Sequence, residues 1–202
     1  MGSSSPHVFM VISMKNDTLI LFGRSMFIEE VKKYIPHLIK SYDTLGINSF
    51  YESYPDIKAV IFYDKDAAPK KQIDNLIITD RKNQDVVANQ KNVELFEVVT
   101  NRCEFSLKQG IINFYYFTSS MAINYAFLKG YKNVVLCGID LMDNLHFDDK
   151  NHKPNIADGI MQQTKKHMED VCLKYINLFQ LNPKSDLKIP KISIDELLKG
   201  EK

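Results

Sequence analysis

Cysteine is scarce in this sequence, and so are long apolar runs. The 202 residues include three cysteines, Cys103, Cys137 and Cys172, which are widely spaced and form no Cys-x-x-Cys pair. Such usage is typical of reduced thiols in a cytoplasmic protein and provides no thiolate metal site. No apolar run approaches the roughly 20 residues that a bilayer-spanning helix needs, so no transmembrane segment is predicted.

An excess of charge of either sign is also lacking. The 26 basic and 25 acidic residues give a formal net charge of +1. Nothing in that balance favours binding to nucleic acid or to an anionic membrane surface. The first residues lack the basic flank of a secretion signal, so residues 1–16 are predicted to be a flexible N-terminus. The length of residues 17–202 suits a single α/β domain.

Strand-like and helix-like segments alternate along the rest of the chain. Strands are predicted in 17–22, 42–50, 57–64, 74–80, 93–99, 132–138 and 176–181, from short runs of apolar and β-branched residues. Helices are predicted in 25–40, 81–92, 118–129, 156–175 and 193–200. The first is predicted to begin at the N-cap Ser25 and to kink or restart at Pro36. Gly130 is the predicted C-cap of the third helix, and Ser193 is the predicted N-cap of the last. Residues 100–113 match no pattern. The alternation predicts a doubly wound, mostly parallel, Rossmann-like α/β sheet.

In such sheets ligands bind at the carboxyl ends of the strands, where the strand order reverses. This rule places Gly23, Asn48, Asp64, Thr118 to Ser120 and Gly138 to His146 along one edge. Each of them follows a predicted strand or begins a helix. This edge is therefore the predicted ligand-binding rim.

Three consecutive hydroxyl residues, Thr118, Ser119 and Ser120, begin an almost wholly apolar helix. The first turn of a helix presents free N–H groups and a partial positive charge, which attract phosphate. The simpler interpretation is that Thr118 or Ser119 is an ordinary N-cap. Gly138 and Asp140 follow the next predicted strand. Because Gly138 has no Cβ, the backbone at this position can come close to a ligand.

Two other strand ends carry polar candidates. The segment FGRSMF has a single glycine, so it is neither a Rossmann nor a P-loop fingerprint. Gly23 suits a tight strand-to-helix turn there, and Arg24 suits either a phosphate contact or a solvated surface. Asp64 suits a hydrogen bond to a ribose or base, or the cap of the next turn.

The segment HFDDKNH places His146, Asp148, Asp149 and His152 close together in one loop. Two histidines and two carboxylates can bind a divalent metal, but this spacing is unspecific. A general acid or base is favoured instead, because histidine titrates near neutral pH and the loop belongs to the predicted rim. No metal site is predicted.

The order of these segments resembles a known family. LILFGRS, LGINSFYES, KAVIFYD, FTSSMAINYAFLKGYKNVVLCGID and INLFQLNPKS are similar to segments of the bacterial lipooligosaccharide sialyltransferases, glycosyltransferase family 42. The resemblance covers most of residues 17 to 187 and is strongest from Thr118 to Asp140. It implies a GT-A-like, inverting transferase that uses a CMP-activated sugar, needs no metal and modifies a surface glycan.

The resemblance also implies roles for individual residues. Asn48 would contact the nucleotide, Thr118 and Ser119 would hold cytidine monophosphate, and Gly138 would allow close backbone approach. His152 would deprotonate the acceptor hydroxyl. Family members are homo-oligomers, and often carry a membrane-associating tail, which implies a cytoplasmic location at the inner face of the inner membrane.

Several positions depart from the family pattern. Arg24 stands where the family has a nucleotide-contacting asparagine, Tyr116 where it has arginine, and Met142 at the first of two phosphate-binding tyrosines. The second tyrosine falls near His146, which in its protonated form is a strong donor to phosphate.

Two alternative functions stay open. One is a phosphotransferase resembling the pterin pyrophosphokinases, in which Asp140, Asp143, Asp148 and Asp149 would act with magnesium. The other is a degenerate, non-catalytic member of the fold.

Overall fold

Eight strands form one sheet in which every strand pairing is parallel. The computed structural model describes residues 17–100, 104–142, 146–148 and 158–199. The strands are β1 (Thr18–Phe22), β2 (Asp43–Ile47), β3 (Ala59–Phe62), β4 (Leu76–Asp80), β5 (Val93–Thr100), β6 (Ile111–Phe114), β7 (Asn133–Cys137) and β8 (Asn177–Gln180). Their order in the sheet is β6-β5-β4-β3-β2-β1-β7-β8. The predicted α/β Rossmann-like fold is confirmed.

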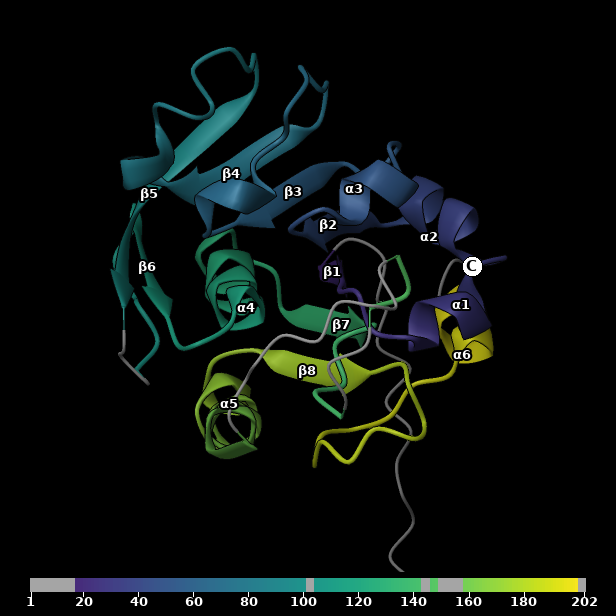
Figure 1. The fold of residues 1–202 in the computed structure, drawn as a ribbon. Helices are drawn as coiled ribbons and strands as arrows, with labels where there is room; N and C mark the ends of the chain where they lie inside the picture. Colours follow the sequence, from purple (N-terminus) through teal and green to yellow (C-terminus); the bar gives the residue numbers. More distant parts are fainter. Residues whose placement is uncertain (1–16, 101–103, 143–145, 149–157, 200–202) are drawn as a thin grey trace, which may run out of the picture.

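Helices cover both faces of the sheet (Figure 1). The α-helices are α1 (Phe27–Val31), α2 (Ile35–Ser41), α3 (Phe50–Ser53), α4 (Thr118–Leu128), α5 (Asp158–Asp170) and α6 (Ile194–Lys199). Short 3₁₀ turns lie at Lys65–Ala67 (η1), Arg81–Asn83 (η2) and Cys172–Lys174 (η3). Among the described residues, no helix combines the length and the apolar character needed to cross a membrane.

The alternation of side chains along β1 explains the two layers. Leu19 and Leu21 belong to a buried cluster that includes the apolar residues of α4, whereas Ile20 and Phe22 pack with α1 and α2 on the opposite face. Successive side chains of a strand point to opposite faces, so a fully apolar strand is stable only when both faces are covered. β1 and β7, with every residue buried, are the centre of the core.

Helix α4 is buried around its whole circumference. Ten of its eleven residues are buried, and it packs across β2, β3 and β6. The polar side chain of Asn124, in the middle of the helix, makes three hydrogen bonds: its Oδ1 accepts from the N–H of Ser106 and Asn113, and its Nδ2 donates to the Ser106 carbonyl. A helix that is apolar on all sides requires such an enclosed position.

Several predicted elements differ from the observed ones. The helix predicted over 25–40 is two helices, α1 and α2, with Pro36 in the first turn of α2, so the predicted restart is confirmed. The helix predicted over 81–92 is wrong, because only the 3₁₀ turn η2 forms there. The N-cap of α1 is Met26 rather than Ser25, and the C-cap of α4 is Lys129, with Gly130 next in a left-handed conformation at φ +85°.

Candidate functional site

The strand order reverses between β1 and β7. The strands from β2 to β6 extend to one side of β1, whereas β7 and β8 lie on the other side. The carboxyl ends of β1 and β7 therefore border the crevice in which parallel α/β sheets usually bind ligands. Gly23 and Gly138 follow these two strands directly, and Asn48 and Asp64 follow β2 and β3 at the same rim.

The backbones of Gly23 and Gly138 are in close contact at the crevice. The Gly23 N–H donates to the Cys137 carbonyl at 2.8 Å, and the Ser25 N–H donates to the Gly138 carbonyl at 3.0 Å. A Cβ atom on Gly23 would lie 2.3 Å from the Gly138 oxygen, and one on Gly138 would lie 2.7 Å from Cγ1 of Ile28. Both glycines are thus required by the packing of the β1–α1 turn against the end of β7.

Asp140 ties three segments together beneath the rim. Its Oδ2 accepts hydrogen bonds from the Ser25 hydroxyl at 2.8 Å and from Nδ2 of Asn182 at 2.7 Å. Asp140 is 5% exposed, and a buried charge of this kind needs such donors. The sequence did not identify Ser25 and Asn182 as partners of Asp140, because they lie far from it along the chain.

The segment after Asn182 is anchored by Lys191. Its Nζ donates to the carbonyls of Ser185 and Leu187, and partial burial lowers its pKa. The Ser185 hydroxyl in turn donates to the Asp140 carbonyl at 3.4 Å. These contacts fix the loop that presents Asn182 to the carboxylate.

Arg24 and Asp148 form an ion pair at the end of β1. The Nε–H of Arg24 donates to both carboxylate oxygens of Asp148, at 2.8 and 3.0 Å. The Phe147 N–H donates to the Arg24 carbonyl, and His146 forms an antiparallel bridge with Ser25. We call residues 146–148 the strap, because they cross the β1–α1 turn at this point.

The first turn of α4 is not capped by a side chain. Phe117 is the N-cap and makes no side-chain capping hydrogen bond, so the interpretation of Thr118 or Ser119 as the N-cap is wrong. The Ser120 hydroxyl accepts from the Tyr115 N–H and donates to the Phe117 carbonyl. Ser119 is 4% exposed, and its buried hydroxyl has no hydrogen-bond partner among the described residues.

Three residues at this rim have strained backbone conformations. Asn48, Tyr116 and Leu141 have φ of +54°, +61° and +52°, in the left-handed region that residues with a Cβ rarely adopt. The Asn48 N–H donates to the Ile61 carbonyl, while its buried Oδ1 has no partner within the described part of the chain. Strain of this kind concentrates at functional sites.

Other candidates contribute less to this arrangement. Asp64 is exposed at the start of η1 and makes no capping bond. Burial and the nearby Asp140 raise the pKa of the Cys137 thiol, which makes it a poor nucleophile. His152, Asp143 and Asp149 lie outside the described residues. Within the described ranges, no group of three or more His, Cys, Asp or Glu side chains is placed to hold a metal ion.

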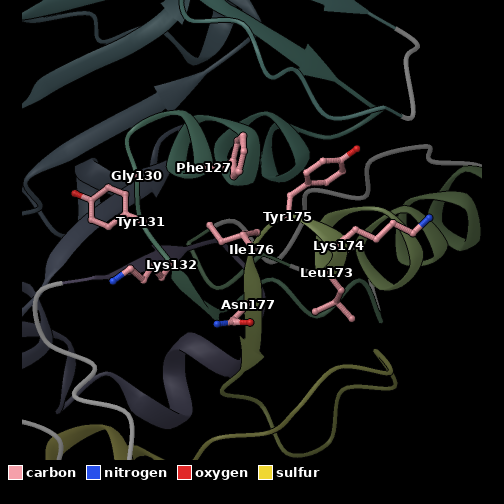
Figure 2. Close-up of a pocket in the computed structure, with 9 residues that line it drawn as sticks. All are labelled: Phe127, Gly130, Tyr131, Lys132, Leu173, Lys174, Tyr175, Ile176 and Asn177. Carbon is pink, nitrogen blue, oxygen red and sulfur yellow. The ribbon is translucent and has the colours of Figure 1, made fainter.

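A groove of about 440 Å³ lies at the other end of the sheet (Figure 2). It is lined by Phe127, Gly130, Tyr131, Lys132, Leu173, Lys174, Tyr175, Ile176 and Asn177. These residues lie at the end of α4 and around the starts of β7 and β8, so they belong to the amino ends of the strands. None of the predicted site residues lines this groove.

The fold is shared with a solved glycosyltransferase structure. The MAf glycosyltransferase from Magnetospirillum magneticum AMB-1 superimposes with a TM-score of 0.62 and 10% sequence identity. The match covers 93% of this chain and 36% of that one, so the chain spans about a third of that protein's length. This chain has a glycosyltransferase-like fold. No protein-family model and no curated protein sequence matches it.

Proposed function

We propose that this protein is a sialyltransferase-like glycosyltransferase that transfers a sugar from a cytidine-nucleotide donor to a bacterial surface glycan. The glycosyltransferase-like fold supports the general class of transferase. The choice of a CMP-activated sugar rests on the resemblance between the FTSSMAINYAFLKGYKNVVLCGID segment and family 42. The donor phosphate would bind at the N-terminus of α4 and the donor nucleoside near Asn48.

The buried hydroxyl of Ser119 carries this proposal. A buried polar atom without a partner costs stability, so a hydroxyl retained in that state is expected to serve a ligand. Ser119 is the second residue of a helix whose first turn has no side-chain cap. The hydroxyl, the adjacent N–H groups and the helix dipole together favour a phosphate oxygen at this position.

The proposed reaction needs one general base and one donor to the leaving group. His152 takes the proton of the acceptor hydroxyl, whose oxygen attacks the anomeric carbon as the bond to the donor phosphate breaks. Protonated His146 donates a hydrogen bond to the departing cytidine monophosphate. The reaction inverts the configuration at the sugar and uses no metal.

Replacing Ser119 tests the phosphate site. Ser119→Ala is expected to weaken binding of cytidine monophosphate about tenfold, because one hydrogen bond to a charged group contributes roughly 1.5 kcal/mol. Isothermal titration calorimetry measures this, and urea denaturation checks that stability is retained. Ser120→Ala is the matched control: its hydroxyl bonds to the Tyr115 and Phe117 backbone, so stability should fall while the affinity of the folded protein persists.

Two results would contradict the proposed phosphate site. One is a wild-type protein that binds no cytidine nucleotide. The other is unchanged affinity in Ser119→Ala.

Replacing His152 tests the chemistry separately from binding. His152→Ala is expected to keep its affinity for cytidine monophosphate and to lose transfer and slow donor hydrolysis at least a hundredfold. The rate of nucleotide release from a CMP-activated sugar measures this loss. Undiminished release in the variant would remove His152 as the base.

A non-catalytic binding module is the second candidate function. The observation that favours it is Met142, which is 47% exposed at a position where the resembling family has a phosphate-binding tyrosine. Methionine cannot donate a hydrogen bond to the departing phosphate. Nucleotide binding by the wild-type protein without any donor hydrolysis would identify this function instead.

A further inference from the structure

Arg24 is the cation nearest in sequence to the glycine contact at the crevice, and its main chain is held on both sides. Gly23 donates to the Cys137 carbonyl before it, and Ser25 bonds to both Gly138 and Asp140 after it. The side chains of Arg24 and Asp148 are only 20% and 15% exposed. The guanidinium is therefore positioned at the end of β1, on the edge of the sheet at which parallel α/β folds bind ligands.

The geometry of the ion pair leaves most of the guanidinium's donors unused. Both Asp148 oxygens accept from the single Nε–H, and within the described residues the Nη groups make no hydrogen bond. Arginine has five N–H donors and binds carboxylate or phosphate best through two parallel N–H···O bonds. A phosphate can make that two-point contact and carries more charge, so it is a stronger partner for Arg24 than Asp148 is.

The strap does not depend on the ion pair for its position. The Phe147 N–H bonds to the Arg24 carbonyl, and the Phe147 ring lies 6.0 Å from that of Phe50 and 6.1 Å from that of Tyr54. Only the Asp148 side chain has to turn away for Arg24 to become available. Side-chain rotation at a partly exposed site is fast and costs little.

We propose that Asp148 is an internal competitor of the ligand: its carboxylate occupies Arg24 in the free protein and is displaced by a phosphate-bearing ligand. This inference rests on the proposed function for the identity of the natural ligand, a cytidine nucleotide donor. Its consequence is regulatory. Asp148 lowers the affinity for every anion that uses Arg24, so weakly held anions are excluded from the site.

Removing the charge of Asp148 tests the competition. Calorimetric titrations with cytidine monophosphate and with inorganic pyrophosphate are compared for the wild type, Asp148→Asn, Arg24→Gln and the double variant. Asp148→Asn is expected to bind both probes roughly three- to tenfold more tightly, the size of a partly exposed ion pair. Arg24→Gln should bind weakly, and adding Asp148→Asn to it should change nothing.

Asp17→Asn is the matched control for net charge. Asp17 precedes β1, whereas Arg24 follows it. The Asp17 carboxylate pairs with Lys132 at the opposite end of the sheet. The control should leave both affinities unchanged. Equal gains in Asp17→Asn and Asp148→Asn would overturn the inference, because a general charge effect would then explain them.

The outcomes separate this inference from the proposed function. Tighter pyrophosphate binding in Asp148→Asn without any binding of cytidine monophosphate supports the competition and contradicts the cytidine donor. Equal or weaker binding of both probes in Asp148→Asn overturns the competition while the cytidine site stands. Failure of Asp148→Asn to bind either anion overturns both the competition by Asp148 and the proposed cytidine-nucleotide donor.

Discussion

Single residues set the geometry of the rim, and Gly138 is the clearest case. Gly138 has φ +72°, and Ile28 occupies the space into which a Cβ would project. Gly130 has a similar φ of +85°, but no atom lies within 4 Å of a Cβ placed there. Both glycines therefore have a positive φ, but only Gly138 lacks the space for a side chain.

Alanine at these two positions is expected to have unequal effects. Gly130→Ala should lower the free energy of unfolding by about 1 kcal/mol, the cost of a left-handed conformation with a Cβ. Gly138→Ala should lower it by about 3 kcal/mol, because overpacking against Ile28 adds to that cost. Urea denaturation measures both values. Equal losses would show that Ile28 moves aside without cost.

The choice among three neighbouring hydroxyls also belongs to the residue scale. The sequence indicated Thr118, Ser119 and Ser120 together as phosphate ligands. It did not show that Phe117 is the N-cap, which decides that Ser120 bonds to the preceding turn and that the Ser119 hydroxyl has no internal partner. A shift of one residue in the helix start would exchange these roles, and helix starts are hard to locate from sequence.

At the scale of elements, buried strands were predictable and polar segments were not. The runs that form β1, β3, β4 and β7 are mostly apolar and almost wholly buried, so local pattern was sufficient. Strand β6 was missed, since Ile111–Phe114 is short and only one of its residues is fully buried. Its pairing partner, β5, stabilises it through contacts that no local pattern reveals.

The wrongly predicted helix over 81–92 has an identifiable cause. The Asp80 carboxylate accepts from the Lys82 N–H, and Asn83 is fully buried with Nδ2 donating to Tyr63 and Thr79. Such side-chain bonds compete with helix formation. Gln90 adds bonds to Ile73 and Lys71 in the same region. Tertiary hydrogen bonds therefore replaced the helix that composition favoured.

For the whole molecule, tyrosines that are wholly or partly buried make the free energy of unfolding depend on pH in the alkaline range. Burial, with Glu52 nearby, raises the pKa of Tyr51 to about 12, and burial with Asp43 nearby raises that of Tyr131 to about 12. Burial also raises the pKa of Tyr125. In the unfolded chain these phenols ionise near pH 10, so the unfolded state loses protons first.

The free energy of unfolding is therefore expected to decrease as the pH rises from about 10 to 12. Urea denaturation at several alkaline pH values measures the decrease. Tyr131→Phe should reduce the slope, because one phenol no longer contributes. A free energy that stays constant through this range would show that these phenols ionise equally in the folded and unfolded states.

The sequence by itself determined the layered α/β architecture and the residues that follow the strands. Alternating apolar runs and amphipathic helices need only local chemistry to be recognised, and Gly23, Asn48 and Gly138 lie at the predicted rim. Only the tertiary structure decided which of these residues meet. The strand order places β7 beside β1, and this brings Ser25, Asp140 and Asn182 into one network and Asp148 onto Arg24. Contacts between residues 42 to 124 positions apart depend on strand pairing, which no local pattern encodes.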